Sequence, residues 1–286
     1  MHSGLAGSVL WKSASRFSKD CINQRMRFHR LVRYDGKKKA CAVGLRGFRP
    51  RNRTLPHESQ TLLIDADDTL WENNVYFERA IGNFISFLEH KELSPKEVRA
   101  VLNEVERDCI VSHGYGLNSF VEALTRTFER VSVEPLTPAL RETIHGFART
   151  IAEHPVEFIP GVRETLEYLH PRHNLILVTK GNFTEQSGKV ERSGLKSFFA
   201  AVEIVAEKNK PTYEGLVQKY GLLREISWMV GNSPRSDINP ALAAGLNAIF
   251  IPHADTWILE HEEIDHSLGT GQLLKLRNFG ELRGHF

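Results

Sequence analysis

The second half of the chain alternates short, continuous apolar runs with segments of helical period, and this alternation limits the possible folds more than any other feature. The apolar runs lie at 175–178, 201–206, 226–230 and 247–251, and a similar run occupies 62–64. Strands that are buried on both faces of a sheet have this continuous apolar character, and strands that alternate with helices form βαβ units. The sequence therefore predicts an α/β fold built on a parallel sheet.

Three carboxylates and a threonine follow the first run, in the stretch Asp65-Ala66-Asp67-Asp68-Thr69. In an extended chain alternate side chains share a face, so Asp65 and Asp67 can face one site. Carboxylates this close together repel one another and need a proton or a cation to coexist. A nucleophile beside a general acid, with a bivalent metal that cancels the charge, has this composition. An Asp-rich turn that caps the next helix explains the stretch, taken alone, equally well.

The other apolar runs also end in polar side chains. In open α/β sheets ligands bind beyond the carboxyl ends of the strands. The side chains placed there are carboxylates, a hydroxyl, ammonium groups and an amide: Asp65, Asp67, Thr179, Lys208, Lys210, Asn232 and Asp237. This inventory favours a functional site over a capping turn. The segment 253–257 follows the last run and lies at the same end of the sheet, where it could flank the site, but a turn with a helix-capping Asp255 or Thr256 is the simpler interpretation.

The middle of the chain, residues 76–154, has the 3.6-residue period of four amphipathic helices, which predicts a small helical bundle. Helix start signals support this interpretation. They are a capping box at Ser94 and Glu97, a second box at Ser119 and Glu122, and a cap at Thr137 before Pro138.

The strand-end motifs, taken in order, resemble the four motifs of the haloacid dehalogenase-like (HAD) hydrolase superfamily, whose members are mostly Mg²⁺-dependent phosphatases. The matching residues are the DxDxT motif at 65–69, Thr179 in the second motif, Lys210-Pro211 in the third and Asp237 within 231–237 in the fourth. The resemblance covers about residues 60–286. It implies a Rossmann-like parallel sheet with helices on both faces as the catalytic core, at 58–72 and 158–286, and an all-helical cap domain at 73–157.

The resemblance also implies roles for individual residues. Asp65 would be the nucleophile that forms an aspartyl-phosphate, and Asp67 the general acid that later activates water. Thr179 and the backbone amide of Lys180 would hold the non-bridging phosphoryl oxygens. A lysine would neutralise the crowded charge, and we favour Lys210 over Lys208 because Lys-Pro is the usual form in the family.

Mg²⁺ is the cofactor that the resemblance implies, and it prefers oxygen ligands in an octahedral arrangement. The expected ligands are Asp65, the carbonyl group of Asp67, and Asn232 or Asp237. The family commonly has Asp where this chain has Asn232. A neutral amide oxygen binds Mg²⁺ more weakly than a carboxylate does, so we expect a higher metal requirement.

The expected activity is Mg²⁺-dependent hydrolysis of a small phosphomonoester. One alternative is a 2-haloacid dehalogenase, but such enzymes need no metal and lack the second Asp of the first motif, which here is Asp67. Another is a catalytically weak binding or regulatory HAD-like protein, which Asn232 would favour. The sequence leaves the substrate open. Our hypothesis is that His113 and Tyr115, on the glycine-containing turn 112–116, reach the site from the cap.

The front of the chain differs from the rest in charge. Residues 1–60 hold 14 of the 37 Lys and Arg but 3 of the 35 Asp and Glu, a net charge of +11 that leaves −9 for the remainder. Residues 1–57 have no sustained period, so we expect a basic, largely disordered extension. A transit peptide, a non-specific binder of nucleic acid or anionic lipid, and an incidental extension are competing readings. We expect no nucleic-acid partner, because no aromatic-basic reader motif appears.

Composition argues against a membrane-spanning protein and against a disulfide framework. No apolar run reaches the roughly 18 residues that a membrane-spanning helix needs. The cysteines, Cys21, Cys41 and Cys109, are odd in number and widely spaced, which favours a reducing compartment. We therefore expect a cytoplasmic enzyme whose partner is a small-molecule phosphate ester. Nothing in the sequence indicates an oligomeric state.

Overall fold

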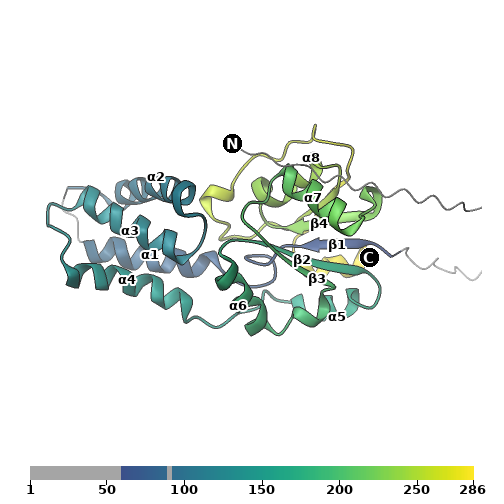
Figure 1. Cartoon of the computed structure of the whole chain (residues 1–286), viewed down its shortest axis with the longest axis horizontal. Helices are drawn as coiled ribbons and strands as arrows, with labels where there is room; N and C mark the ends of the chain where they lie inside the picture. The colour runs from purple at the N-terminus through teal and green to yellow at the C-terminus, as the bar shows by residue number, and fades with distance from the viewer. Residues whose placement is uncertain (1–58, 89–91) are drawn as a thin grey trace, which may run out of the picture. The chain divides into compact units, whose positions relative to one another are not determined.

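A computed structural model of the chain describes residues 59–88 and 92–286. Its centre is a sheet of six parallel strands in the order β3-β2-β1-β4-β5-β6, so the predicted α/β fold is confirmed (Figure 1). The strands are β1 (Thr61–Ile64), β2 (Asn174–Lys180), β3 (Ala201–Val205), β4 (Ser227–Gly231), β5 (Asn247–Phe250) and β6 (Leu273–Lys275). The sequence did not predict β6, a three-residue edge strand that is partly exposed. The expectations for the basic extension at 1–57 lie outside the described residues.

Helices cover both faces of the sheet, because alternate strand side chains point to opposite sides. In β1, Leu62 and Ile64 pack into a cluster with the helices of one face, while Leu63 packs into a cluster with those of the other. The helices of the first face are α5 (Val162–Leu169) and α6 (Phe183–Ser193); those of the second are α7 (Lys210–Tyr220) and α8 (Asn239–Ala243) (Figure 1). Burial on both faces explains why the strands have continuous apolar sequences.

The central strand places the first motif at the carboxyl edge of the sheet. Ile64, the last residue of β1, pairs with Leu177 of β2 on one side and with Val230 of β4 on the other. The backbone N–H of Asp65 then donates to the carbonyl oxygen of Val230 at 2.9 Å. Asp65 therefore lies at the level where β2 and β4 are about to end, and the polar residues after these strands gather around it.

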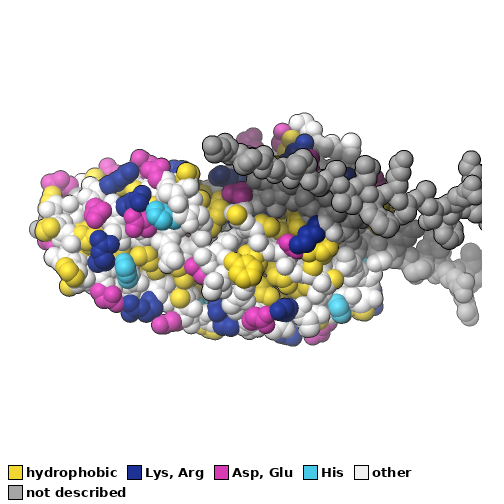
Figure 2. All heavy atoms as spheres, viewed as in Figure 1, with side chains coloured by type: hydrophobic (Ala, Val, Ile, Leu, Met, Phe, Trp, Pro, Cys, Tyr) yellow, Lys and Arg dark blue, Asp and Glu magenta, His cyan; other side chains and the backbone are white. Residues whose placement is uncertain are grey.

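Four helices lie in sequence between β1 and β2: α1 (Asn74–Leu88), α2 (Pro95–His113), α3 (Leu117–Val131) and α4 (Pro138–Ala152). They enclose a hydrophobic cluster of their own, with Phe84, Leu102, Leu124 and Ile144 fully buried. Acidic and basic side chains alternate over the face of this bundle in Figure 2, as on a solvated surface. We call these helices the cap.

Two of the three helix start signals agree with the structure. Ser94 and Glu97 form the predicted capping box of α2, and the Thr137 hydroxyl accepts from the N–H of Leu140 at the start of α4. The box at Ser119 was wrong, because α3 already begins at Leu117, after Gly116, and Ser119 is buried within its first turns.

Short turns connect the remaining elements. They are 3₁₀ helices at Lys196–Phe198, Arg224–Ile226, Ile258–Glu260 and Phe279–Gly284, and a π-helical turn at Pro234–Ile238. Among the described residues, no helix has the length and apolar character needed to cross a membrane.

Candidate active site

A cavity of about 170 Å³ opens where the carboxyl ends of the strands face the cap. Side chains from the strand ends form its floor, and side chains from α1, α2 and α3 form its opposite wall. Six of the predicted site residues line it: Asp65, Asp67, Thr179, Lys180, Asn232 and Asp237. Two predicted residues, Lys210 and His113, are not among its lining residues.

The floor is organised around a buried ammonium group. Lys208 Nζ contacts Asp65 Oδ1, and it lies 2.7 Å from Asp237 Oδ1. Lys208 is 4% exposed and Asp237 is 1% exposed, so little water screens this arrangement. Burial raises the pKa of Asp65 to about 7, although the Lys208 charge opposes the rise. The two carboxylates share one cation, so the group has a net negative charge whenever Asp65 is ionised, and that charge favours a further cation.

The preference for Lys210 over Lys208 is corrected by these contacts. Lys210 is the first residue of α7, and its side chain is 55% exposed and lies 3.8 Å from Glu214 on the same helix. Lys208 precedes the Asn209 cap of that helix and points back to the end of β1. The Lys-Pro pair thus marks the start of the helix, while the lysine two residues earlier carries the charge at the site.

Gly231 allows Asp237 to approach the sheet. A Cβ atom at position 231 would lie 2.2 Å from Asp237 Oδ2, far inside contact distance. The carboxylate is fixed there because the N–H of Ser233 donates to Asp237 Oδ2 at 3.0 Å. The glycine at the end of β4 is therefore a steric requirement for placing this carboxylate against Lys208.

Asn232 directs its oxygen toward Thr69, whose hydroxyl also contacts Asp65. Its Nδ2 donates to Thr256 Oγ1 at 3.0 Å, which turns Oδ1 toward the hydroxyl of Thr69 at 3.3 Å. Thr69 Oγ1 also donates to Asp65 Oδ2 at 2.9 Å, so one hydroxyl joins the two oxygens. The segment 253–257 thus flanks the site, one of the two possibilities that its sequence allowed.

Asp67 lies in a separate ion pair on the same floor. Its carboxylate accepts hydrogen bonds from Lys189 Nζ at 2.9 and 3.0 Å, from Gln186 Nε2 at 2.9 Å and from Trp71 Nε1 at 2.7 Å. Burial by itself would raise the pKa of Asp67, but the Lys189 charge and these hydrogen bonds outweigh it and lower that pKa. Asp67 is consequently held as a carboxylate while Asp65 is partly protonated near neutral pH, so the two acids have different proton affinities.

Comparison with known proteins is consistent with this geometry. The model of the haloacid dehalogenase-like hydrolase family matches residues 60–245. The chain belongs to this family. No curated protein matches the sequence.

Solved structures of HAD-like proteins share the fold. A haloacid dehalogenase-like family hydrolase from Xanthomonas campestris is 28% identical with a TM-score of 0.67, over 79% of this chain and 90% of that one. A predicted phosphoglycolate phosphatase from Haemophilus somnus is 16% identical with a TM-score of 0.54, over 79% and 97%. The L-2-haloacid dehalogenase of Xanthobacter autotrophicus is 13% identical with a TM-score of 0.53, over 79% and 97%. The chain is therefore a HAD-like hydrolase, a family that holds both phosphatases and dehalogenases.

Thr179 is connected to Asp67 of the first motif by hydrogen bonds through Gln186. Its Oγ1 donates to Gln186 Oε1 at 3.2 Å, and the other end of the same amide donates to Asp67. Lys180, the next residue, pairs with Glu260 at 2.7 Å and donates to Ser236 Oγ at 2.9 Å. The Lys180 side chain is thus occupied within this HAD-like core, although it lines the cavity.

Tyr115, not His113, reaches the site from the cap. His113 is exposed, and its ring Nδ1 lies 2.8 Å from Ser112 Oγ. The hydroxyl of Tyr115 donates to Glu207 Oε2 at 2.8 Å, and Lys180 Nζ lies 4.1 Å from the centre of its ring. The hypothesis is therefore corrected for His113, because the α2 helix runs through His113 and directs its imidazole to solvent, whereas Tyr115 follows the turn toward the core.

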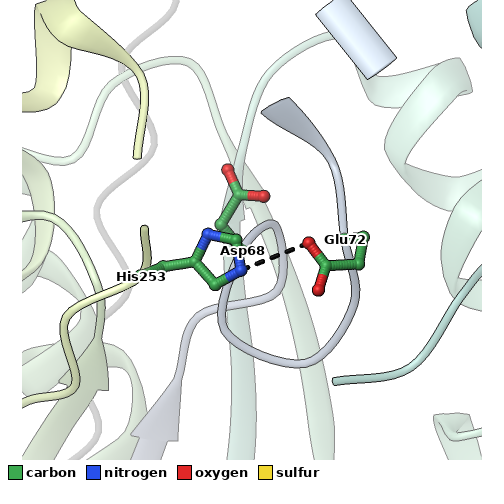
Figure 3. Close-up of side chains that lie close together, drawn as sticks. All are labelled: Asp68, Glu72 and His253. Carbon is green, nitrogen blue, oxygen red and sulfur yellow. Dashed lines mark ion pairs between the residues drawn. The ribbon is translucent and has the colours of Figure 1, made fainter. Parts of the chain in front are cut away.

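A second group of possible ligands lies beside the first motif. Oxygens of Asp68 and Glu72 and a ring nitrogen of His253 all lie within 4.8 Å of one another (Figure 3). His253 Nε2 is 3.2 Å from Glu72 Oε2, and Asp68 accepts from the N–H groups of Asn73 and Asn74. These contacts account for the group as an ion pair beside a helix-capping carboxylate.

The floor suits the metal that the family implies. Asp65, Asn232 and Asp237 offer oxygen atoms, which are the donors that Mg²⁺ prefers. In the described part of the chain, the hydrogen bonds of the turn run from Trp71 N–H to Ala66 and from Asp68 N–H to Trp71, and neither uses the Asp67 carbonyl. The donor chemistry and the excess negative charge both fit a divalent cation.

Sequence reasoning missed several residues of the site. Gln186 and Lys189 are three positions apart on α6, so they share a helix face, and that face begins seven residues after Thr179. This spacing could have predicted that both side chains lie near Thr179 at the site. Glu106 and Trp257 also line the cavity. Trp257 belongs to the segment 253–257, which follows the last apolar run, whereas Glu106 lies on a cap helix, where no strand-end motif could indicate it.

Proposed function

We propose that this HAD-like hydrolase cleaves a small phosphomonoester with Mg²⁺ as cofactor. The observation that carries the proposal is that two carboxylates line one cavity with separate partners, Asp65 against Lys208 and Asp67 against Lys189. Two neighbouring acids in different surroundings are suited to different roles in one reaction.

Asp65 is the nucleophile in this proposal. One of its oxygens attacks phosphorus, the ester P–O bond breaks, and an aspartyl-phosphate forms. Lys208 and Thr179 line the same cavity as Asp65, and their ammonium group and hydroxyl would stabilise the negative charge of the phosphoryl oxygens there. Bound Mg²⁺, held by Asp65, the Asp67 carbonyl and Asn232 or Asp237, would lower the pKa of Asp65 and neutralise phosphoryl charge.

Asp67 handles the proton. An alkoxide leaving group needs a proton, and the dianionic phosphate that enters the site raises the pKa of Asp67 by its negative charge, which lets it carry one. After the alcohol has left, the Asp67 carboxylate takes a proton from the water that hydrolyses the aspartyl-phosphate. Lys189 and Gln186 hold that carboxylate in place throughout.

The presence of Asp67 also supports a phosphatase over a dehalogenase. A halide leaves without a proton, so displacement of halide does not need a second acid beside the nucleophile. In this chain the second acid is present, and three neighbouring side chains orient it.

The test is hydrolysis of an aryl phosphate by the wild-type protein and by Asp65→Asn, each with and without Mg²⁺. We expect turnover that requires the metal and falls by at least about a thousandfold in the variant. Glu104→Gln, which removes an exposed carboxylate from the cap, is the matched control and should leave turnover unchanged. Metal-independent release of chloride from a 2-chloro acid would establish the dehalogenase instead, and no turnover of any ester would favour a binding protein.

A further inference from the structure

The cap wall of the cavity is apolar except at a few positions. Phe77, Ile81, Ile110 and Phe120 contribute apolar surface there. Within this wall lies Glu106, on α2, which is 6% exposed. A carboxylate in apolar surroundings is costly unless it is paired, so its partner has to be identified.

One oxygen of Glu106 has no partner in the described part of the chain. Its Oε2 is buried and receives no hydrogen bond there. Arg99, a basic residue two turns earlier on α2, is engaged elsewhere, since its guanidinium donates to Glu78 at 2.5 and 2.8 Å and to Asn103 at 2.7 Å. The neighbouring Arg107 is exposed. None of the described cap residues therefore donates a hydrogen bond to this oxygen of Glu106.

The cations that line the cavity are also occupied. Lys208 is bound to Asp65 and Asp237, Lys189 to Asp67, and Lys180 to Glu260. All three belong to the floor, and the described cap residues contribute no cation to the lining. A substrate that carried a second anionic group into the cap would meet the negative charge of Glu106 with no compensating cation.

We propose that Glu106 selects the substrate by receiving its ammonium group, so that the substrate is the phosphomonoester of a small amino alcohol. The phosphate lies on the floor at Asp65, the carbon chain lies against the apolar cap side chains, and the ammonium donates to Glu106. This inference rests on the proposed phosphatase function and adds the class of its substrate. It also disfavours phosphomonoesters with a carboxylate at that end.

The proton affinity of Glu106 agrees with this assignment. Burial raises the pKa of Glu106 to about 7, although the charges of Arg99 and Arg107 oppose the rise. An ammonium group beside it would stabilise the charged form and lower the pKa. The ammonium group of the substrate would therefore pair with Glu106 as a lysine or arginine of the protein would otherwise do.

The experiment compares esters that differ at one end. 3-Aminopropyl phosphate and butyl phosphate have chains of similar length, but only the first carries an ammonium group; the two-carbon and four-carbon amino esters test the reach. Wild type should have a kcat/KM about tenfold or more higher for the best amino ester. Glu106→Gln should remove this preference by raising KM for the amino ester, while Glu104→Gln on the same helix should keep it.

A binding measurement separates this inference from the hydrolase proposal. In the Asp65→Asn variant with magnesium chloride, the amino ester should raise Tm more than the butyl ester, and adding Glu106→Gln should abolish the difference. If the aryl phosphate is hydrolysed but the amino and butyl esters have equal kcat/KM and raise Tm equally, the substrate assignment is overturned and the phosphatase proposal stands. If no ester is hydrolysed but the Tm preference persists and depends on Glu106, the assignment stands and the phosphatase fails. If no amino ester is hydrolysed or raises Tm, the assignment is overturned.

Discussion

The floor and the cap wall of the cavity treat charge in opposite ways. On the floor each lysine that lines the cavity has a carboxylate partner, and the hydrogen bonds extend from Asp65 to Thr69 and Asn232. On the cap wall Glu106 has a buried oxygen without a described partner. A charge network that is complete before the substrate binds suits chemistry, which needs preorganised groups. An incomplete one suits recognition, because the ligand supplies what is missing.

The largest expected effect comes from breaking the floor. Lys208→Met removes the cation between Asp65 and Asp237, and two buried carboxylates then face each other without compensation. We expect kcat/KM for an aryl phosphate to fall by about a thousandfold. Lys210→Met, two residues away and exposed, is the matched control and should stay within about twofold of wild type. Equal losses in the two variants would contradict the assignment of Lys208.

An intermediate effect is expected from neutralising the cap wall. The pKa of Glu106 is about 7 in the fold against a reference of 4.5, so ionisation costs the folded state up to about 3 kcal/mol. Below pH 4.5 the group is neutral in both states and the cost is absent; stability is then lost as the pH rises through 7.

Glu106→Gln should therefore be as stable as wild type at pH 4.5 and more stable by up to about 3 kcal/mol at pH 8. Urea denaturation at several pH values measures the difference. Glu104→Gln removes an exposed carboxylate from the same helix and should show no such trend. A Glu106→Gln variant that is less stable than wild type at pH 8 would mean that Glu106 has a partner in the free protein.

The smallest effect concerns the contact between cap and floor. Tyr115→Phe deletes the hydroxyl that donates to Glu207, a partly exposed hydrogen bond worth about 1 kcal/mol. We expect KM for the aryl phosphate to rise about fivefold while kcat changes less than twofold. His113→Ala should behave as wild type in the same assay, since its ring faces solvent. A larger effect of His113→Ala than of Tyr115→Phe would restore the hypothesis that His113 reaches the site.

The sequence predicted the structure best in the segments whose residue types are determined by burial. Continuous apolar runs identified five of the six strands, and the polar residues after them predicted where the cavity floor lies. The prediction that Lys210, and not Lys208, lies at the site was wrong, because the answer depends on where α7 begins. Residues just before and just after a helix cap can point in opposite directions.

The cap wall was harder to predict, because its residues come from three helices whose packing no local pattern specifies. Glu106 still carries a signal. It lies four residues from both Leu102 and Ile110, on a helix face that packs inward, and a carboxylate at such a position is unusual. Its role can be inferred only from the structure, in which Arg99 on the same helix is bound to Glu78.

The close approach of Asp237 to Gly231 limits how this site can evolve. As long as the carboxylate occupies its present place, position 231 has no room for even a methyl group, so a mutation there cannot be absorbed by adjusting a neighbouring side chain. A lineage that lost this glycine would have to abandon the carboxylate as well, and with it one of the two partners of Lys208. Gly231 and Asp237 are therefore expected to be retained or lost together. Asp237 contributes the carboxylate, and Gly231 contributes the space that the carboxylate needs.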